Sequence, residues 1–163
     1  MTEWRPPTPR EELEILRSTS TVAIVGMSTD PSRASYFVAT YLLSSSCRFD
    51  EVWFVNPKGG EVFGRPVYPS LADLPGVPDL IDVFRRPSEL PNVAREFVAI
   101  PGIRTFWAQL GLYSAEAGDI VMAAGRVAVM NRCLKIEHAR FAGGLHCAGF
   151  DTGVVSSRRH PDL

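Results

Sequence analysis

The sequence predicts an α/β fold: a doubly wound, mainly parallel sheet of five to six strands with helices on both faces. Three observations predict it. Short apolar runs rich in valine and isoleucine recur along the chain, helical patterns separate them, and most runs end directly at polar residues or glycine. Strands that alternate with helices form repeated βαβ units, so a Rossmann-like arrangement is expected.

The strands are predicted from the apolar runs. Continuous apolar runs are typical of strands that are buried on both faces of a parallel sheet. The predicted buried strands cover residues 21–25, 51–55, 80–84, 103–108 and 126–130, and a short edge strand covers 67–70.

The helices are predicted from apolar residues at helical spacing and from capping residues. Thr8 can cap the first helix, Pro9 fits its first turn and Glu11 stands in the capping-box position. Ser35 and Ser114 are the expected caps of two later helices. The predicted helices cover residues 9–18, 35–43, 91–100, 114–124 and 134–140, with one helical turn over 71–74.

Length and composition limit the class of protein. With 163 residues, 45% of them hydrophobic, the chain is expected to form one domain over 1–163, with a core over about 20–142 and a tail over about 143–163. The formal net charge of −1 argues against a nucleic-acid partner. No apolar run is long enough to span a bilayer and the N-terminus lacks the apolar core of a signal peptide, so a cytoplasmic protein without a membrane partner is expected.

The ligand site is expected at the carboxyl ends of the strands. In a doubly wound sheet, ligands bind there, where the strand order reverses on either side of the first strand. A purely structural protein needs no concentration of polar groups at this position. Five polar or glycine-containing segments follow the predicted strands directly: 26–28, 56–59, 84–87, 109–111 and 131–133.

The loop after the first strand is suited to a phosphate group. Gly26 allows a tight turn and a close backbone approach, and the N–H groups at the start of the next helix can hold an anion. Arg33 and Ser35 add a guanidinium group and a hydroxyl group at the same place. An ordinary loop between a strand and a helix is the alternative.

The loop after the second strand argues against an NAD site. The Gly-x-Gly-x-x-Gly fingerprint is absent, and Asn56 stands where an acidic residue would bind the adenosine ribose. Lys58 follows two residues later, and a cation there suits a ribose that carries a phosphate. NADP carries such a phosphate at the 2′ position and coenzyme A carries one at the 3′ position. A plain turn over 56–59 is the alternative to a site.

Arg85 and Arg86 follow the strand that is expected beside the first strand. Two guanidinium groups at the end of a strand resemble a pyrophosphate clamp. The alternative is that one of them is solvated and the other pairs with Glu89.

Cys133 and His138 suggest a nucleophile or a metal site. Cys133 is expected to end the last strand. A zinc site needs three or four ligands, and only His146 and Cys147 could supply the others. A cysteine and a histidine without an oxyanion-hole motif are weak evidence for catalysis. No catalytic residue and no metal site are therefore predicted, and packed or capping roles are expected for both side chains.

Seven short motifs follow one another within about residues 10–142. They are VAIVGMS (22–28), PSRASY (31–36), VNPKG (55–59), VYPSL (67–71), DVFRR (82–86), WAQLG (107–111) and NRCLKIEH (131–138). This series resembles the small stand-alone CoA-binding proteins, whose domain is similar to the CoA-binding domain of the succinyl-CoA synthetase α subunit. The sequence departs from that family at two positions: Met27 stands where alanine or leucine is usual, and Asn131 where aspartate is common.

The resemblance implies that the chain binds coenzyme A or an acyl-CoA as a non-catalytic binding or regulatory module. The second domain of the synthetase, which carries a phosphohistidine, and its nucleotide-binding partner subunit have no counterpart in this sequence. The alternatives are an enzyme that uses CoA thioesters, ligase- or transferase-like and acting with a partner, and an NADP-linked oxidoreductase. A homodimer or an unknown protein partner is also left open. The implied ligand-binding residues are Gly26, Met27, Ser28, Arg33, Ser35, Tyr36, Asn56, Pro57, Lys58, Val83, Phe84, Arg85, Gln109 and Gly111.

Overall fold

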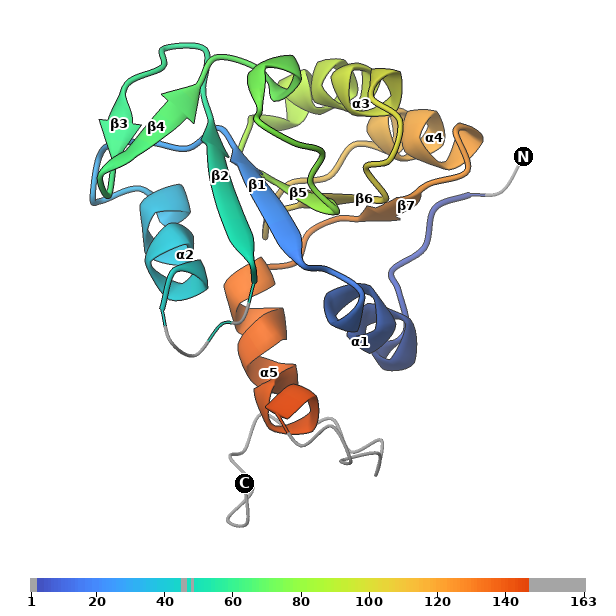
Figure 1. The fold of residues 1–163 in the computed structure, drawn as a ribbon. Coiled ribbons are helices and arrows are strands. Elements are labelled where there is room, and N and C mark those ends of the chain that lie inside the picture. The colour runs from blue at the N-terminus through green and yellow to red at the C-terminus, as the bar shows by residue number, and fades with distance from the viewer. Residues whose placement is uncertain (1–2, 45–46, 48, 147–163) are drawn as a thin grey trace.

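Seven strands form one sheet within residues 3–44, 47 and 49–146, which are the residues that this computed structural model describes (Figure 1). Their order across the sheet is β3-β4-β2-β1-β5-β6-β7, and every neighbouring pair is parallel except β3 with β4. The predicted α/β class is confirmed. The strands are β1 (Thr21–Val25), β2 (Glu51–Val55), β3 (Glu61–Val62), β4 (Arg65–Tyr68), β5 (Leu80–Val83), β6 (Thr105–Ala108) and β7 (Val127–Val129).

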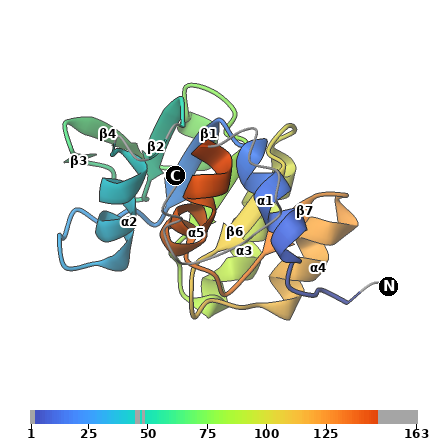
Figure 2. The same cartoon turned by 90° about the horizontal axis from the view of Figure 1, so that it is seen from below.

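Helices cover both faces of the sheet. Figure 2 shows α5 lying between α1 and α2 on one face, and Figure 1 shows α3 and α4 together on the other. No helix of the described residues is long and apolar enough to cross a membrane. The helices are α1 (Pro9–Arg17), α2 (Ala34–Leu42), α3 (Leu90–Ala99), α4 (Ala115–Ala123) and α5 (Leu134–His146), with short 3₁₀ turns η1 (Leu71–Asp73) and η2 (Pro87–Glu89).

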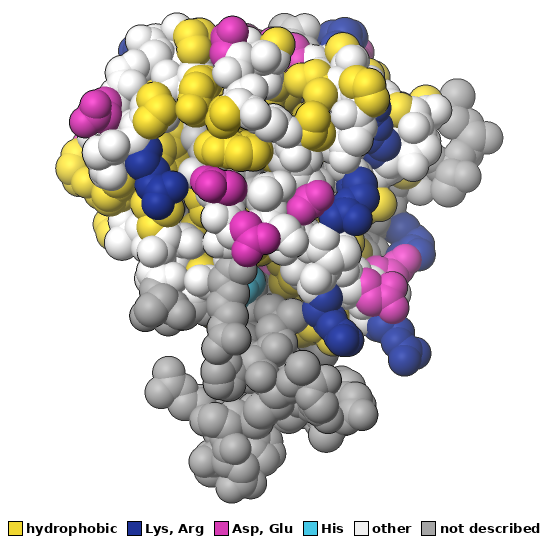
Figure 3. All heavy atoms as spheres, in the orientation of Figure 1, with side chains coloured by type: hydrophobic (Ala, Val, Ile, Leu, Met, Phe, Trp, Pro, Cys, Tyr) yellow, Lys and Arg dark blue, Asp and Glu magenta, His cyan; other side chains and the backbone are white. Residues whose placement is uncertain are grey.

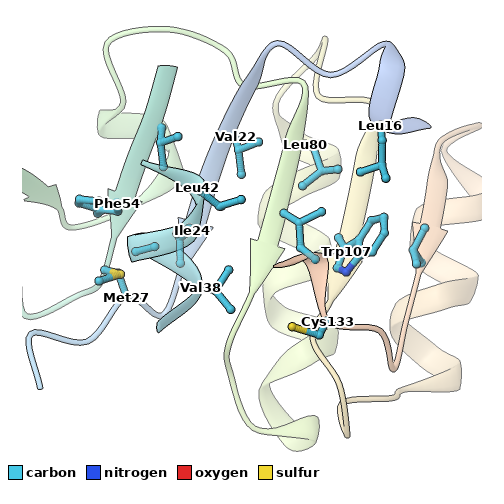
Figure 4. Packing of buried hydrophobic residues seen from close by; sticks show 14 of the residues in the cluster. Leu16, Val22, Ile24, Met27, Val38, Leu42, Phe54, Leu80, Trp107 and Cys133 are labelled. Atoms are coloured by element: carbon cyan, nitrogen blue, oxygen red, sulfur yellow. The ribbon is translucent and has the colours of Figure 1, made fainter. Parts of the chain in front are cut away.

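Alternate residues of the central strand enter two separate cores. Val22 and Ile24 of β1 belong to the first core cluster, which lies beneath α1, α2 and α5. Ala23 and Val25 belong to the second core cluster, which lies beneath α3 and α4. Figure 4 shows part of the first cluster, in which the fully buried Trp107 of β6 and Ile24 of β1 lie on the same face of the sheet, two strands apart. Burial on both faces explains why the strands are continuous apolar runs.

The expected capping of two helices is confirmed. The hydroxyl of Thr8 accepts from the backbone nitrogen of Glu11 at 3.2 Å, and the Glu11 carboxylate accepts from the backbone nitrogen of Thr8 at 2.9 Å. Ser114 accepts from the backbone nitrogen of Ala117 at 3.1 Å at the start of α4. The local capping signals therefore located both helix starts correctly.

The sheet has one strand more than predicted. The strand predicted over 67–70 is β4, but it is not the edge strand, because the two-residue strand β3 pairs outside it. Phe63 and Gly64 form the turn between them, and both have positive φ angles, of 55° and 70°. A two-residue hairpin needs this backbone conformation, and phenylalanine at the first position hides the usual sequence signal.

The C-terminal part of the fold differs from the prediction at two points. β7 ends at Val129, so Cys133 does not end the last strand but directly precedes α5. Helix α5 is also longer than the predicted 134–140 and extends to His146. The expected tail over about 143–163 thus begins inside α5, and residues 147–163 lie outside the described part of the chain.

Charges are mixed on the surface. On the face shown in Figure 3, basic and acidic side chains are interspersed with apolar ones. This distribution agrees with a formal net charge of −1 over the whole sequence.

Candidate functional site

The carboxyl ends of three neighbouring strands lie level with one another. Val25 at the end of β1 pairs with Val55 of β2 on one side and with Val83 of β5 on the other. The loops that follow these strands therefore start at one edge, which we call the carboxyl edge. Strand order reverses at β1, and this is the position where doubly wound sheets bind ligands.

Asn56 joins the loops after β1 and β2. Its amide nitrogen donates to the backbone oxygen of Met27 at 2.9 Å, and its amide oxygen accepts from the backbone nitrogen of Lys58 at 3.0 Å. The backbone nitrogens of Gly26 and Met27 also donate to the oxygen of Val55, at 2.8 and 3.1 Å. Because the Met27 side chain is buried in the first core cluster, this residue reaches the carboxyl edge through its backbone.

Side chains within the loop after β1 hold its shape. Ser35 is buried in the first turn of α2, and its hydroxyl accepts from the backbone nitrogen of Ser28 at 3.0 Å. The prediction that Ser35 caps α2 is wrong, because Arg33 occupies the N-cap. The Asp30 carboxylate accepts from the backbone nitrogen and the hydroxyl of Ser32, at 2.9 and 2.8 Å. These hydrogen bonds lower the pKa of Asp30.

Gly26 is required by the close approach of two loops. Its φ angle is 88°, and a Cβ atom there would lie 2.7 Å from the backbone oxygen of Phe84 and 3.1 Å from Cδ of Arg85. A contact of 2.7 Å with backbone cannot be relieved by a rotamer change, so a larger residue would push the loops apart. The sequence suggested that Gly26 makes room for a ligand, and the structure shows that it makes room for the neighbouring loop.

Four basic side chains belong to the three central loops. Arg33 follows β1, Lys58 follows β2, and Arg85 and Arg86 follow β5; Arg85 is half-buried and the others are exposed. Among the described residues, neither Arg85 nor Arg86 forms an ion pair with Glu89. The ion pairs that the described residues do form involve other arginines, namely Arg5, Arg95, Arg104 and Arg140.

The loops after β6 and β7 are joined in a similar way. The backbone nitrogen of Gly111 donates to Oδ1 of Asn131 at 2.7 Å, and the backbone nitrogen of Asn131 donates to the oxygen of Leu112 at 3.0 Å. Asn131 has a φ angle of 59°, which asparagine adopts more readily than most residues. Gln109 is buried, and its Oε1 accepts from the backbone nitrogen of Leu134 at 3.4 Å, so it contacts the start of α5.

The remaining predicted site residues differ in exposure. Val83 is fully buried in the second core cluster, and Phe84 packs against the first. Tyr36 is half-buried, with its ring centroid 4.6 Å from that of Phe63. Val83 and Gln109 are buried, so they can support the loops from within but are not exposed at the carboxyl edge. The predicted residues that are exposed at the carboxyl edge are Arg33, Pro57, Lys58 and Gly111.

Cys133 and His138 have different neighbours: Cys133 packs in the first core cluster, and His138 bonds Tyr41. Both are buried, but five positions along α5 turn a side chain by about 140° around the helix axis. The His138 ring contacts Tyr41 and Cys47 on the side of α2. No group of three metal-binding side chains occurs among the described residues. The side chains of His146 and Cys147, named above as further ligands, lie outside that part of the structure.

Sequence reasoning missed Asp82, although an acidic residue in an apolar run was a visible signal. Asp82 lies in β5 between Ile24 and Trp107 of the adjacent strands and is fully buried. Neither of its carboxyl oxygens has a hydrogen-bond partner among the described residues. Burial raises the pKa of Asp82 well above its usual range, because a carboxylate that is removed from water is less stable than the neutral carboxyl group.

Comparisons with known proteins found a matching family model and several similar proteins. A family model described as a CoA binding domain matches residues 20–139. The uncharacterized protein YneT of Bacillus subtilis is 36% identical over 133 residues, which are 82% of this chain and 96% of that protein. A hypothetical protein from Pyrococcus horikoshii has a similar structure, with a TM-score of 0.77 and 35% identity over 88% of this chain and 100% of that one.

A larger protein contains a similar fold. The acetyl-coenzyme A synthetase 1 of Ca. Korarchaeum cryptofilum matches 73% of this chain and 28% of its own, with a TM-score of 0.61. At 24% identity this likeness concerns the fold alone.

Proposed function

We propose that this chain, which belongs to the CoA-binding domain family, binds coenzyme A or an acyl-CoA at the carboxyl edge and acts as a non-catalytic binding or regulatory module. One observation carries the proposal. The loops after β1, β2 and β5 start level with one another at the strand-order reversal, and each brings at least one basic side chain there. Coenzyme A carries three phosphate groups, so a site for it needs several cations from different loops.

Each cation fits one part of the ligand. In this architecture the adenosine ribose lies beside the second strand, so Lys58 suits the 3′-phosphate. Arg33 stands at the N-cap of α2, where backbone N–H groups and a guanidinium group together suit the pyrophosphate. Arg85 lies against the same loop, since its Cδ is close to Gly26. The pantetheine arm would then extend toward the loops that Asn131 joins.

The burial of Cys133 and the contacts of His138 support the non-catalytic role. Cys133 is 8% exposed and packs in the first core cluster, and the His138 ring faces α2. A catalytic cysteine needs a base within hydrogen-bond reach. His138 contacts Cys47 and Tyr41 instead, and the side chain of Gln109 bonds the start of α5.

Isothermal titration calorimetry tests the proposal. We expect coenzyme A to bind with a dissociation constant in the micromolar range, because several charge-assisted contacts contribute. NADP has a 2′-phosphate and no pantetheine, and it serves as the matched control ligand. Heat and a thermal shift with NADP, combined with neither effect from excess coenzyme A, would exclude the proposed ligand and favour an NADP-linked function.

A further inference from the structure

The segment that precedes α1 passes the open edge of the sheet. Strand β7 is the terminal strand of the sheet, with β6 as its neighbour. Trp4 packs against the second core cluster, whereas Leu16 of α1 lies in the first, on the opposite face of the sheet. Residues 4–8, which we call the strap, therefore cross beside β7 from one face to the other. Figure 1 shows this part of the chain running past β7 to α1.

Trp4 anchors the strap to the backbone of β7. Its indole nitrogen Nε1 donates to the backbone oxygen of Ala128 at 2.7 Å. The centroid of its ring lies 5.6 Å from that of Tyr113. A Cβ atom at Gly118 of α4 would lie 3.5 Å from Cβ of Trp4 and 3.0 Å from Cε of Met130. The lack of a side chain at Gly118 therefore leaves the space beside α4 in which Trp4 lies.

The oxygen that Trp4 bonds belongs to the outer side of β7. The backbone nitrogen of Val127 donates to the oxygen of Arg104, on the side of β6. Successive residues of a strand direct their backbone groups to opposite sides in turn, so the N–H and C=O groups of Ala128 point away from β6. The indole N–H of Trp4 therefore occupies the position that the donor of a further strand would take.

The outer edge of β7 is self-complementary. Its sequence, Val-Ala-Val over 127–129, is symmetric about Ala128. An antiparallel β7 from a second copy would place Ala128 opposite Ala128, with an N–H···O=C bond in each direction, and Val127 opposite Val129. None of the three residues is charged or a proline, which are the residues that commonly block an edge strand. The preceding Arg126 is directed elsewhere, because its guanidinium donates to three backbone oxygens at the C-terminal end of α3.

We propose that the strap keeps β7 from pairing with a second copy of this chain, and that its release produces an antiparallel dimer in which two sheets join at Ala128. The same strand serves both copies, so the interface has twofold symmetry. The strap and the second copy exclude each other, because both need the oxygen of Ala128. Pairing would also cover Val127, whose side chain is 43% exposed. This assembly does not depend on the binding of coenzyme A.

Two variants release the strap in different ways. Trp4→Ala removes the indole, and Gly118→Leu fills the space beside α4 in which Trp4 lies. Light scattering after size-exclusion chromatography measures the molar mass over a dilution series. We expect each variant to reach twice the mass of the wild type as its concentration rises. Arg5→Ala is the matched control and should keep the wild-type mass, because Arg5 lies on the strap but pairs with Glu11 at the surface.

A second substitution identifies the surface that associates. Val127→Lys adds a charge to the edge of β7, so it should restore the wild-type mass in either release variant. Hydrogen exchange of the Ala128 amide should slow as the dimer forms, because this N–H group gains a partner. The proposal is wrong if a release variant that is folded by circular dichroism keeps the wild-type mass, or if Val127→Lys leaves an increased mass unchanged. Where one release variant fails to fold, the other decides.

Discussion

Asn56 explains, at the scale of one residue, why the second strand does not end in an acidic residue. Its amide both donates to Met27 and accepts from Lys58. An aspartate could only accept, so the backbone oxygen of Met27 would lose its partner. The same change would place a negative charge beside Lys58, where a phosphate is proposed to bind. The residue type thus follows from the contact between two loops as well as from the ligand.

The basic residues give a prediction that separates the phosphates of the ligand. Lys58→Ala should weaken the binding of coenzyme A by about tenfold to a hundredfold, because a charged hydrogen bond contributes roughly 1.5–3 kcal/mol. It should barely affect dephospho-CoA, which lacks the 3′-phosphate. Arg33→Ala should weaken both ligands by similar factors, because both keep the pyrophosphate. Calorimetry on the two variants with both ligands measures this, and each variant is its own control for damage to the fold.

Equal losses of both ligands in Lys58→Ala would contradict this assignment. The ribose phosphate would then be held by another cation, and Arg85 and Arg86 at the end of β5 are the alternatives.

The candidate site was predictable from the sequence only in part. Gly26, Arg33, Asn56 and Lys58 could be placed at one edge because each follows a strand that is recognisable by itself. The contacts of these residues could not be predicted. Ser35 was expected to cap its own helix, yet it bonds Ser28. Such contacts depend on how loops are placed in space, which local sequence signals do not encode.

At the scale of elements, α1 and α5 meet through two buried acidic residues. Glu12 is 2% exposed, and its Oε1 has no hydrogen-bond partner among the described residues. Burial and the neighbouring Glu137 raise the pKa of Glu12 to about 8. The capping box of α1 is local and was predicted correctly, whereas Glu137 lies far along the chain. The sequence therefore predicted where this helix begins and that Leu16 packs on the domain, but not the contact between Glu12 and Glu137.

The contact between α1 and α5 gives a prediction about pH. The folded-state pKa of Glu12 is raised, so its favourable contribution is complete below about pH 4.5 and falls as the pH rises toward 8. Glu12→Gln keeps a neutral group at every pH. Relative to the wild type, its free energy of unfolding should therefore increase between pH 5 and pH 8, by roughly 3 kcal/mol.

Urea unfolding at pH 5 and at pH 8 measures this difference. Glu14→Gln on the exposed side of α1 is the matched control and should show no such change. If Glu12→Gln alters stability by the same amount at both pH values, Glu12 does not titrate between them.

At the scale of the whole molecule, the proposed ligand would join loops from both halves of the sheet. The loops after β2 and β1 lie on one side of the strand-order reversal, and those after β5 and β6 lie on the other. At the far edge, Trp4 adds a further link, because its indole nitrogen donates to the backbone oxygen of Ala128 in β7 at 2.7 Å. Binding to loops on both sides of the strand-order reversal should therefore stabilise the global fold rather than one loop.

We expect coenzyme A to raise the unfolding temperature. At a ligand concentration a hundred times the dissociation constant, the stabilisation is about 2.7 kcal/mol. For a domain of this size that corresponds to roughly 5–10 °C. Differential scanning calorimetry measures the shift, with NADP at the same concentration as the control. If the ligand changed the hydrogen-exchange rates of the loops without raising the unfolding temperature, it would bind to a locally opened form instead.

The place of α5 in the chain has a consequence for synthesis on the ribosome. Translation releases β1, α2 and β2 first, yet the first core cluster also needs Leu134 and Phe141 of α5. Until α5 emerges, Val22 and Ile24 lack some of their packing partners, so their side chains stay exposed and accessible to chaperones. Gln109 also lacks its contact with Leu134, and the bond from Gly111 to Asn131 forms only when β7 has been followed by its loop. The carboxyl edge of the nascent chain is therefore complete only after nearly all of the strands have been synthesised.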